Sequence, residues 1–236
     1  MMADEPAHIR ILSAGAPKGG VGACAETFAA TTGGEVSVEF ATAPVLRERV
    51  EGGRAAADIV VAPVPDMQRF AAAGTIVAGT EIVVGSVRAG VAVRAGAPVP
   101  DISSAAAFEQ ALLAADGIVY NEASSGRYIA DLLDRLGLAD ALREKTVRVP
   151  NGAAAMEYLA GSSGTVIGFG QIPEIRRLTD EGVALVGPLP EPLGKSTTYA
   201  AGLLAGAASP DAARALLEFM ATPEAARLCA GAGLEQ

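Results

Sequence analysis

Short apolar runs alternate with segments of helical apolar spacing along the first third of the chain. The run 9–13 is typical of a buried strand, and the apolar positions within 17–31 fall on one face of a helix. The same order then repeats. We expect a strand at 36–40, a helix at 44–52, a strand at 58–62 and a helix that begins at about 65. Such βαβαβα alternation predicts a mostly parallel sheet flanked by helices, which is an α/β fold.

The pattern changes at 81–95, which is too long for an ordinary buried strand and contains Gly85 and Gly90. A long strand of this kind can pass between two lobes. Beyond it the alternation resumes, and we expect helices 104–115, 126–136, 152–160 and 173–181 with strands 117–120, 146–149, 165–169 and 183–187. The last expected elements are strand 197–205, suited to pair with 91–95, and helices 210–221 and one from Pro223.

Composition and charge argue against several classes of partner. Half of the 236 residues are apolar, and the formal net charge of −9 is spread without long charged runs. This charge argues against binding of nucleic acid or of anionic membrane surfaces. No stretch has the apolar length of a signal peptide or of a membrane span, so we expect no membrane insertion.

Metal and histidine chemistry are not expected. The single histidine, His8, stands at the polar start of the first strand, and Cys24 and Cys229 lack CxxC spacing. The two cysteines are expected as small buried side chains, with a disulfide between them as the less favoured alternative. These residues cannot assemble a zinc site or a histidine-based nucleophile, and we expect neither a metal nor a cofactor.

The turn at 13–20, with the sequence Ser-Ala-Gly-Ala-Pro-Lys-Gly-Gly, leads from the first strand into the first helix. Unpaired N–H groups and the positive end of the helix dipole meet there, an arrangement that binds anions. Lys18 adds a full positive charge. The plain alternative is an ordinary strand–helix turn. The spacing does not match the GxxxxGK[ST] phosphate-binding loop, so nucleotide binding is not expected.

Three blocks, which together span nearly the whole chain, carry a resemblance to a known family. They are the opening turn at 11–21, the segments 40–53 and 57–60, and the C-terminal segments 212–226 and 231–235. The chain resembles the type 2 periplasmic solute-binding proteins, in the branch that includes the molybdate-binding proteins. The resemblance implies two lobes, each a mostly parallel sheet flanked by helices, with a ligand cleft between them. We expect lobe I to comprise residues 1–82 and 205–236, and lobe II residues 83–204.

The resemblance also implies where a ligand binds, mostly at the starts of helices. The candidate ligand-binding residues are Ala14, Gly15, Ala16, Lys18, Thr42, Ala43, Ser124, Ser125, Gly126, Arg127, Gly152, Ala153 and Gln171. Molybdate-binding proteins hold the oxyanion with two serine hydroxyls, backbone N–H groups and a tyrosine hydroxyl.

This chain departs from that donor set. Ala16 and Ala43 stand at the two serine positions, although Thr42 offers a hydroxyl beside the second, and Gln171 stands at or near the tyrosine position. Each hydroxyl donor lost from a desolvated oxyanion costs about 1–3 kcal/mol. Lys18 and Arg127 supply positive charge that suits a carboxylate. We therefore expect an organic carboxylate as ligand rather than molybdate or tungstate.

The favoured interpretation is a monomeric binding protein without enzyme activity. It captures a small anion and delivers it to the permease of an ABC-type transporter. The resemblance places it in the periplasm or otherwise outside the cytoplasm, with an export signal removed from the sequence given. If the chain is complete, the lack of a signal peptide predicts a cytoplasmic location instead, and a cytosolic sensor is a further alternative.

Two other functions remain open. The opening turn and the Arg-Ala-Gly-Ala-Pro block at 94–98 resemble sequences of the aconitate-isomerase type, which implies an enzyme that shifts a proton on a tricarboxylate. Such an enzyme needs a base at the ligand, and the candidates are Glu122, Lys18, Tyr128 and Tyr199. The second alternative is a molybdate- or oxyanion-binding protein.

Overall fold

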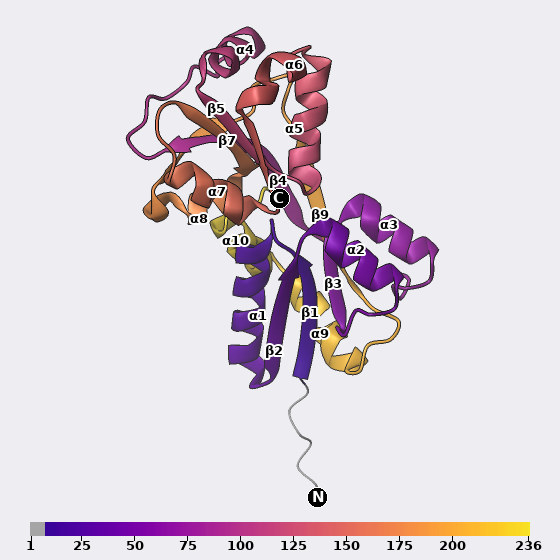
Figure 1. Cartoon of the computed structure of the whole chain (residues 1–236). Helices are drawn as coiled ribbons and strands as arrows, with labels where there is room; N and C mark the ends of the chain where they lie inside the picture. Colours follow the sequence, from indigo (N-terminus) through magenta and orange to yellow (C-terminus); the bar gives the residue numbers. More distant parts are fainter. Residues whose placement is uncertain (1–7) are drawn as a thin grey trace, which may run out of the picture. The chain divides into compact units, whose positions relative to one another are not determined.

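A computed structural model describes residues 8–236, which divide into two units (Figure 1). Unit 1 comprises the described residues up to Val87 together with Thr197–Gln236, and unit 2 comprises Arg88–Ser196. The chain therefore passes from one unit to the other within strand β4 (Ile82–Arg94) and again at the start of strand β9 (Ser196–Leu203). Among the described helices, none combines the length and apolarity that crossing a bilayer requires.

Unit 1 begins with three strand–helix pairs. They are β1 (His8–Ala14), α1 (Lys18–Thr32), β2 (Glu35–Ala41), α2 (Ala43–Glu51), β3 (Ile59–Pro63) and α3 (Val64–Ala72). β1 pairs in parallel with β2 and β3, and β3 pairs antiparallel with β9. In the order β2-β1-β3, successive right-handed crossovers run in opposite directions, so α1 and α2 lie on opposite faces of the sheet (Figure 1).

The C-terminal helices α9 (Pro210–Met220) and α10 (Pro223–Gly231) complete unit 1 by packing against α1. Cys24 of α1 and Cys229 of α10 are both free and buried, and their Sγ atoms lie 3.9 Å apart. Their burial agrees with the sequence prediction. The core of unit 1 is centred on β3, which is buried along its whole length because helices cover both faces.

Unit 2 has a second sheet of this kind. Its strands are β4, β5 (Gly117–Asn121), β6 (Thr146–Val149), β7 (Val166–Gln171) and β8 (Val183–Pro188). Its helices are α4 (Ala105–Ala114), α5 (Ser124–Arg135), α6 (Ala139–Leu142), α7 (Gly152–Ala160) and α8 (Ile172–Arg177), with 3₁₀ turns η1 (Arg143–Lys145) and η2 (Thr179–Glu181). β5 pairs in parallel with β6 and β7, whereas β4 pairs antiparallel with β7 and β8.

Two apolar clusters lie on the two faces of the unit 2 sheet. One contains side chains of α4, α5 and α6, and the other contains side chains of α7 and α8. The structure thus confirms the α/β class, with two units that each consist of a sheet flanked by helices.

The structure corrects three details of the sequence prediction. Strand β9 lies between β3 and β4, so it adjoins the expected partner strand, but not along 91–95. Residues 91–94 are already paired with β8, with β7 on the other side of 91–92. The single helix expected at 173–181 is divided at Leu178 into α8 and η2. The short helix α6 was not predicted, because four residues are too few for a readable apolar period.

Candidate functional site

The carboxyl edge of the unit 1 sheet brings together the starts of α1 and α2. β1 and β2 are parallel neighbours, and Ala14 at the end of β1 lies opposite Ala41 at the end of β2. Each helix begins shortly after its strand ends, so 15–18 and 42–43 meet at one sheet edge. The strand order also reverses at β1, and ligands of open α/β sheets bind at such switch points.

The start of α1 keeps backbone donors free. The N–H of Lys18 donates to Gly15 O at 3.2 Å, and that of Val21 donates to Pro17 O at 3.0 Å. The N–H groups of Gly19 and Gly20 have no acceptor within the described part of the chain, and no side chain caps the helix. Two backbone donors are therefore unpaired at the positive end of the helix dipole, an arrangement that suits an anion.

Residue 16 brings no hydroxyl group to this end of α1. Ala16 is buried and presents a methyl group. The Lys18 side chain is exposed, and its Nζ lies 5.0 Å from the ring centroid of Phe40, in the strand that precedes α2. No carboxylate among the described residues pairs with Lys18, so its charge remains available to a ligand.

The start of α2 has a similar character. Thr42 is the N-cap, but its side chain makes no cap hydrogen bond, and Pro44 has no N–H. The N–H of Leu46 donates to Thr42 O at 2.9 Å, which leaves the N–H groups of Ala43 and Val45 without acceptors among residues 8–236. The buried Ala43 again presents a methyl group.

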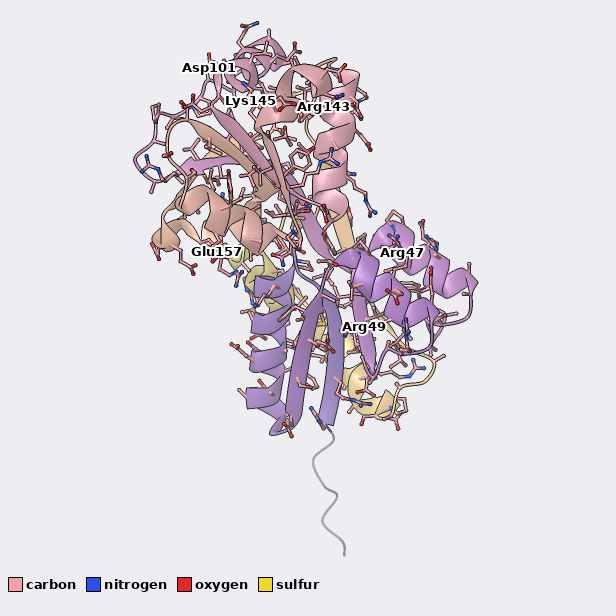
Figure 2. All side chains as sticks on the ribbon, in the orientation of Figure 1. Arg47, Arg49, Asp101, Arg143, Lys145 and Glu157 are labelled. Carbon is pink, nitrogen blue, oxygen red and sulfur yellow. The ribbon has the colours of Figure 1, made fainter. Side chains whose placement is uncertain are left out.

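An ion pair not foreseen from the sequence fixes α2 against α3. Arg47 Nε donates to Asp66 Oδ1 at 2.8 Å, and its second terminal nitrogen donates to Oδ2 at 3.1 Å. Asp66 is buried and Arg47 is partly exposed on α2 (Figure 2). The hydrogen bond to Asp66 raises the pKa of Arg47 further above its usual value, although burial acts in the opposite direction. The two residues are 19 positions apart, a separation that carries no sequence signal.

In unit 2, the buried Asn121 organises the start of α5. Its Oδ1 accepts from the N–H of Ala123 at 2.9 Å and from that of Gly126 at 3.3 Å, while Nδ2 donates to Ser125 Oγ at 3.0 Å. The N–H of Gly126 and the hydroxyl of Ser125, both candidate ligand donors, are therefore engaged within the chain. The N–H of Ser125 keeps no acceptor among the described residues. Ser124 is the first residue of α5.

The remaining candidates near α5 are solvent-facing or already engaged. Arg127 is exposed and forms no ion pair with any described residue. Glu122 is an exposed loop residue whose N–H donates to Val149 O at 2.8 Å. Tyr128 donates its hydroxyl to Leu193 O at 3.0 Å, and Tyr199 of unit 1 is buried.

The start of α7 differs because a carboxyl group already faces it. Asn151 caps the helix by accepting from the N–H of Ala154 at 2.9 Å, and the N–H groups of Gly152 and Ala153 have no acceptor in the described chain. However, a Cβ on Gly152 would lie only 2.4 Å from Glu174 Oε2. An external anion at this helix start would therefore meet a carboxyl group.

Glu174 occupies the third position of α8, whose N-cap is Gln171. Burial raises the pKa of the Glu174 carboxyl, while Arg177 and the N–H of Gln171 act in the opposite direction. The Gln171 side chain is itself buried, with 5% of the residue exposed, and its Oε1 has no hydrogen-bond partner in the described chain. Within residues 8–236, no three His, Cys, Asp or Glu side chains gather as a metal site would require.

Residues 9–235 match the model of the family described as "Bacterial extracellular solute-binding protein". Aconitate isomerase from a Pseudomonas species is 29% identical over 234 residues, which cover 96% of this chain and 87% of that relative.

Two solved structures share the fold. The periplasmic molybdate-binding protein of Azotobacter vinelandii has a TM-score of 0.80 at 17% identity, over 97% of this chain and 99% of that one. The sulfate-binding protein SubI from Mycobacterium tuberculosis has a TM-score of 0.76 at 21% identity, over 96% of this chain and 86% of that one.

Proposed function

The chain belongs to the bacterial extracellular solute-binding proteins, and we propose that it captures a small organic carboxylate for an ABC-type transporter. The observation that carries this proposal is the donor set at the carboxyl edge of unit 1. Free N–H groups and the Lys18 ammonium are present, whereas Ala16 and Ala43 place methyl groups where hydroxyls would complete an oxyanion site. Because the family is extracellular, we place the protein outside the cytoplasm.

A carboxylate matches these donors better than a tetrahedral oxyanion does. A carboxylate has two oxygens to satisfy, which the N–H groups of one helix start can do. Molybdate or sulfate has four, and each oxygen left without a donor in a desolvated site costs about 1–3 kcal/mol.

Unit 2 contributes a second source of positive charge. Arg127 projects from the first turn of α5 and pairs with no carboxylate in the described chain. A planar guanidinium binds a carboxylate through two parallel hydrogen bonds. Arg127 therefore gives unit 2 a contact for a carboxylate group of its own, despite the net charge of −9.

The second candidate function is an isomerase acting on a tricarboxylate. It is favoured by the 29% identity to aconitate isomerase, which extends over 96% of this chain. The reaction needs a base that removes a proton from one carbon and a group that returns it to another. Glu122 and Lys18 are the foremost candidates for the base.

Thermal unfolding with a panel of anions tests the proposal. We expect succinate, malate, citrate, tricarballylate or aconitate to raise Tm more than molybdate or sulfate. A ligand at 100 times its Kd contributes about 2.7 kcal/mol, or about 5–10 °C in Tm for a protein of this size. Arg127→Gln should reduce the shift, whereas Arg143→Gln, an equal charge change at an exposed arginine paired with Asp140, should not. A larger shift with molybdate than with any carboxylate contradicts the proposal.

Chromatography of cis-aconitate incubated with the protein separates the two candidate functions. Binding without formation of trans-aconitate supports the binding protein. Turnover that is abolished by Glu122→Gln supports the isomerase.

A further inference from the structure

Two buried side-chain amides at the carboxyl edge of the unit 2 sheet differ in their hydrogen bonding. Asn121, at the end of β5, uses both Oδ1 and Nδ2 in hydrogen bonds within the chain. Gln171, at the end of β7, is 5% exposed, and its Oε1 accepts no hydrogen bond from any described residue. Buried acceptors without a donor are rare and costly in folded proteins. The contrast indicates that the donor for Gln171 Oε1 comes from a bound molecule rather than from the chain.

The position of Gln171 in its strand shows where this acceptor lies. Side chains at alternate positions of a strand share one face, so Gln171 is on the face of Ile167 and Phe169. Those two residues pack in the same apolar cluster as Ile129 and Leu132 of α5. Gln171 is thus on the α5 side of the sheet, at the carboxyl edge, which is also the edge where α5 begins.

The topology of unit 2 makes this edge a ligand-binding position. The strand order β7-β5-β6 reverses at β5, so the chain after β5 enters α5 on one face while α7 packs on the other. Switch points of this kind are where open α/β sheets bind ligands. The end of β7 and the start of α5 flank the switch point, and the N–H of Ser125 has no acceptor there among the described residues.

We infer that unit 2 binds a hydroxycarboxylic acid, whose carboxylate accepts from the Ser125 N–H at the start of α5 and whose hydroxyl donates to Gln171 Oε1. The inference rests on the proposed function and deepens it by naming the class of carboxylate. Arg127, exposed on the same helix turn, adds charge for the carboxylate.

Ligands without a donor do not satisfy this arrangement. Sulfate and molybdate, fully ionised at neutral pH, would bring oxygen lone pairs against the lone pairs of Oε1. A carboxylate without a hydroxyl would leave the acceptor unpaired. Sites built to hydrogen-bond a hydroxyl reject analogues that lack it, and an unpaired buried acceptor corresponds to about a 5-fold to 150-fold loss of affinity.

Titration calorimetry with two matched pairs tests the inference, because each pair differs only in one hydroxyl. The pairs are malate with succinate, and citrate with tricarballylate. In the wild-type protein, we expect the hydroxylated member of at least one pair to bind about 10-fold tighter or more. Gln171→Met keeps the length of the side chain and removes the acceptor, so it should bring that ratio close to 1.

Three outcomes overturn the inference. Equal affinity for both members of each pair in the wild-type protein overturns it and leaves the proposed carboxylate function standing, and this result does not depend on whether the variant folds. A preference that persists in Gln171→Met with an unchanged circular dichroism spectrum also overturns it. If no carboxylate binds while an inorganic oxyanion does, the proposed function fails together with the inference.

Discussion

The guanidinium of Arg47 donates two hydrogen bonds to the carboxylate of Asp66, at 2.8 and 3.1 Å, and this pair fixes α2 against α3. The pair lies within two turns of Thr42, the N-cap of α2, so it holds the orientation of a helix start that belongs to the candidate site. The Asp66 side chain is almost wholly buried, and without Arg47 its charge would have no partner of this strength.

We expect Arg47→Met to destabilise the protein because it leaves Asp66 buried and unpaired. Breaking a buried pair costs about 3–5 kcal/mol, and the partial exposure of Arg47 places the expected value at the lower end. Arg49→Met is the matched control on the same helix, since Arg49 pairs with the exposed Glu39 and such a pair contributes about 0–1 kcal/mol (Figure 2). Urea unfolding measures both, and equal losses for the two variants would contradict the assigned role of the Arg47–Asp66 pair.

The ionised carboxyl of Asp58 stabilises unit 1, and this stabilisation depends on pH. Burial raises the pKa of its carboxyl, but the N–H groups of Arg10, Ser209 and Ala208 and the charge of Arg10 outweigh that effect and hold the pKa below its usual value. A lowered pKa stabilises the fold above the ordinary Asp pKa of about 3.9, and this stabilisation is lost as pH falls through the folded-state value. We expect Asp58→Asn to be less stable than wild type at pH 7, with a difference that shrinks below about pH 4. Urea unfolding between pH 7 and 3 checks this, and a difference that stays constant with pH would argue against it.

Serine in place of Ala16 and Ala43 should restore oxyanion binding. Both alanines lie at helix starts with free N–H groups, and each added hydroxyl supplies about 1–3 kcal/mol to a desolvated oxyanion. We expect the double variant Ala16→Ser with Ala43→Ser to bind molybdate at least about 10-fold tighter than wild type. Calorimetry with molybdate measures the gain, and unchanged weak binding in a folded variant would show that these positions do not face the ligand.

Gly126 is required by the close approach of α5 to the end of β5. A Cβ at this position would lie 1.4 Å from Asn121 O, so Gly126→Ala must displace the start of α5. We expect a loss of stability of about 3 kcal/mol or more, since overpacking alone costs about 1–3 kcal/mol, together with weaker anion binding. Gly22→Ala is the contrasting variant: a Cβ there would meet no atom of the described residues within 4 Å, and alanine in a helix interior stabilises by about 0.5–1 kcal/mol. A Gly126→Ala protein as stable as wild type would refute this account of the turn.

Much of the fold and part of the candidate site were predictable from the sequence. Apolar periodicity depends only on near neighbours in the chain, so it gave the order of strands and helices with few errors. Parallel strands joined by helices place all their carboxyl ends at one edge, and this rule alone brings 15–18 and 42–43 together. The resemblance to solute-binding proteins, confirmed by the family match over residues 9–235, then pointed to these helix starts as ligand loops.

The spacing of residues along the chain assigns them to faces and edges, but packing between separate elements sets which of them meet. It paired β9 with β3, turned Gly126 N–H inward onto Asn121, set Glu174 against the start of α7 and left Gln171 Oε1 without a partner in the described chain. These relationships join separate elements, so they depend on distances of a few ångströms set by packing across the sheets. Apolar periodicity does not specify such distances. A shift of a side chain by a fraction of an ångström is enough to form or break a hydrogen bond.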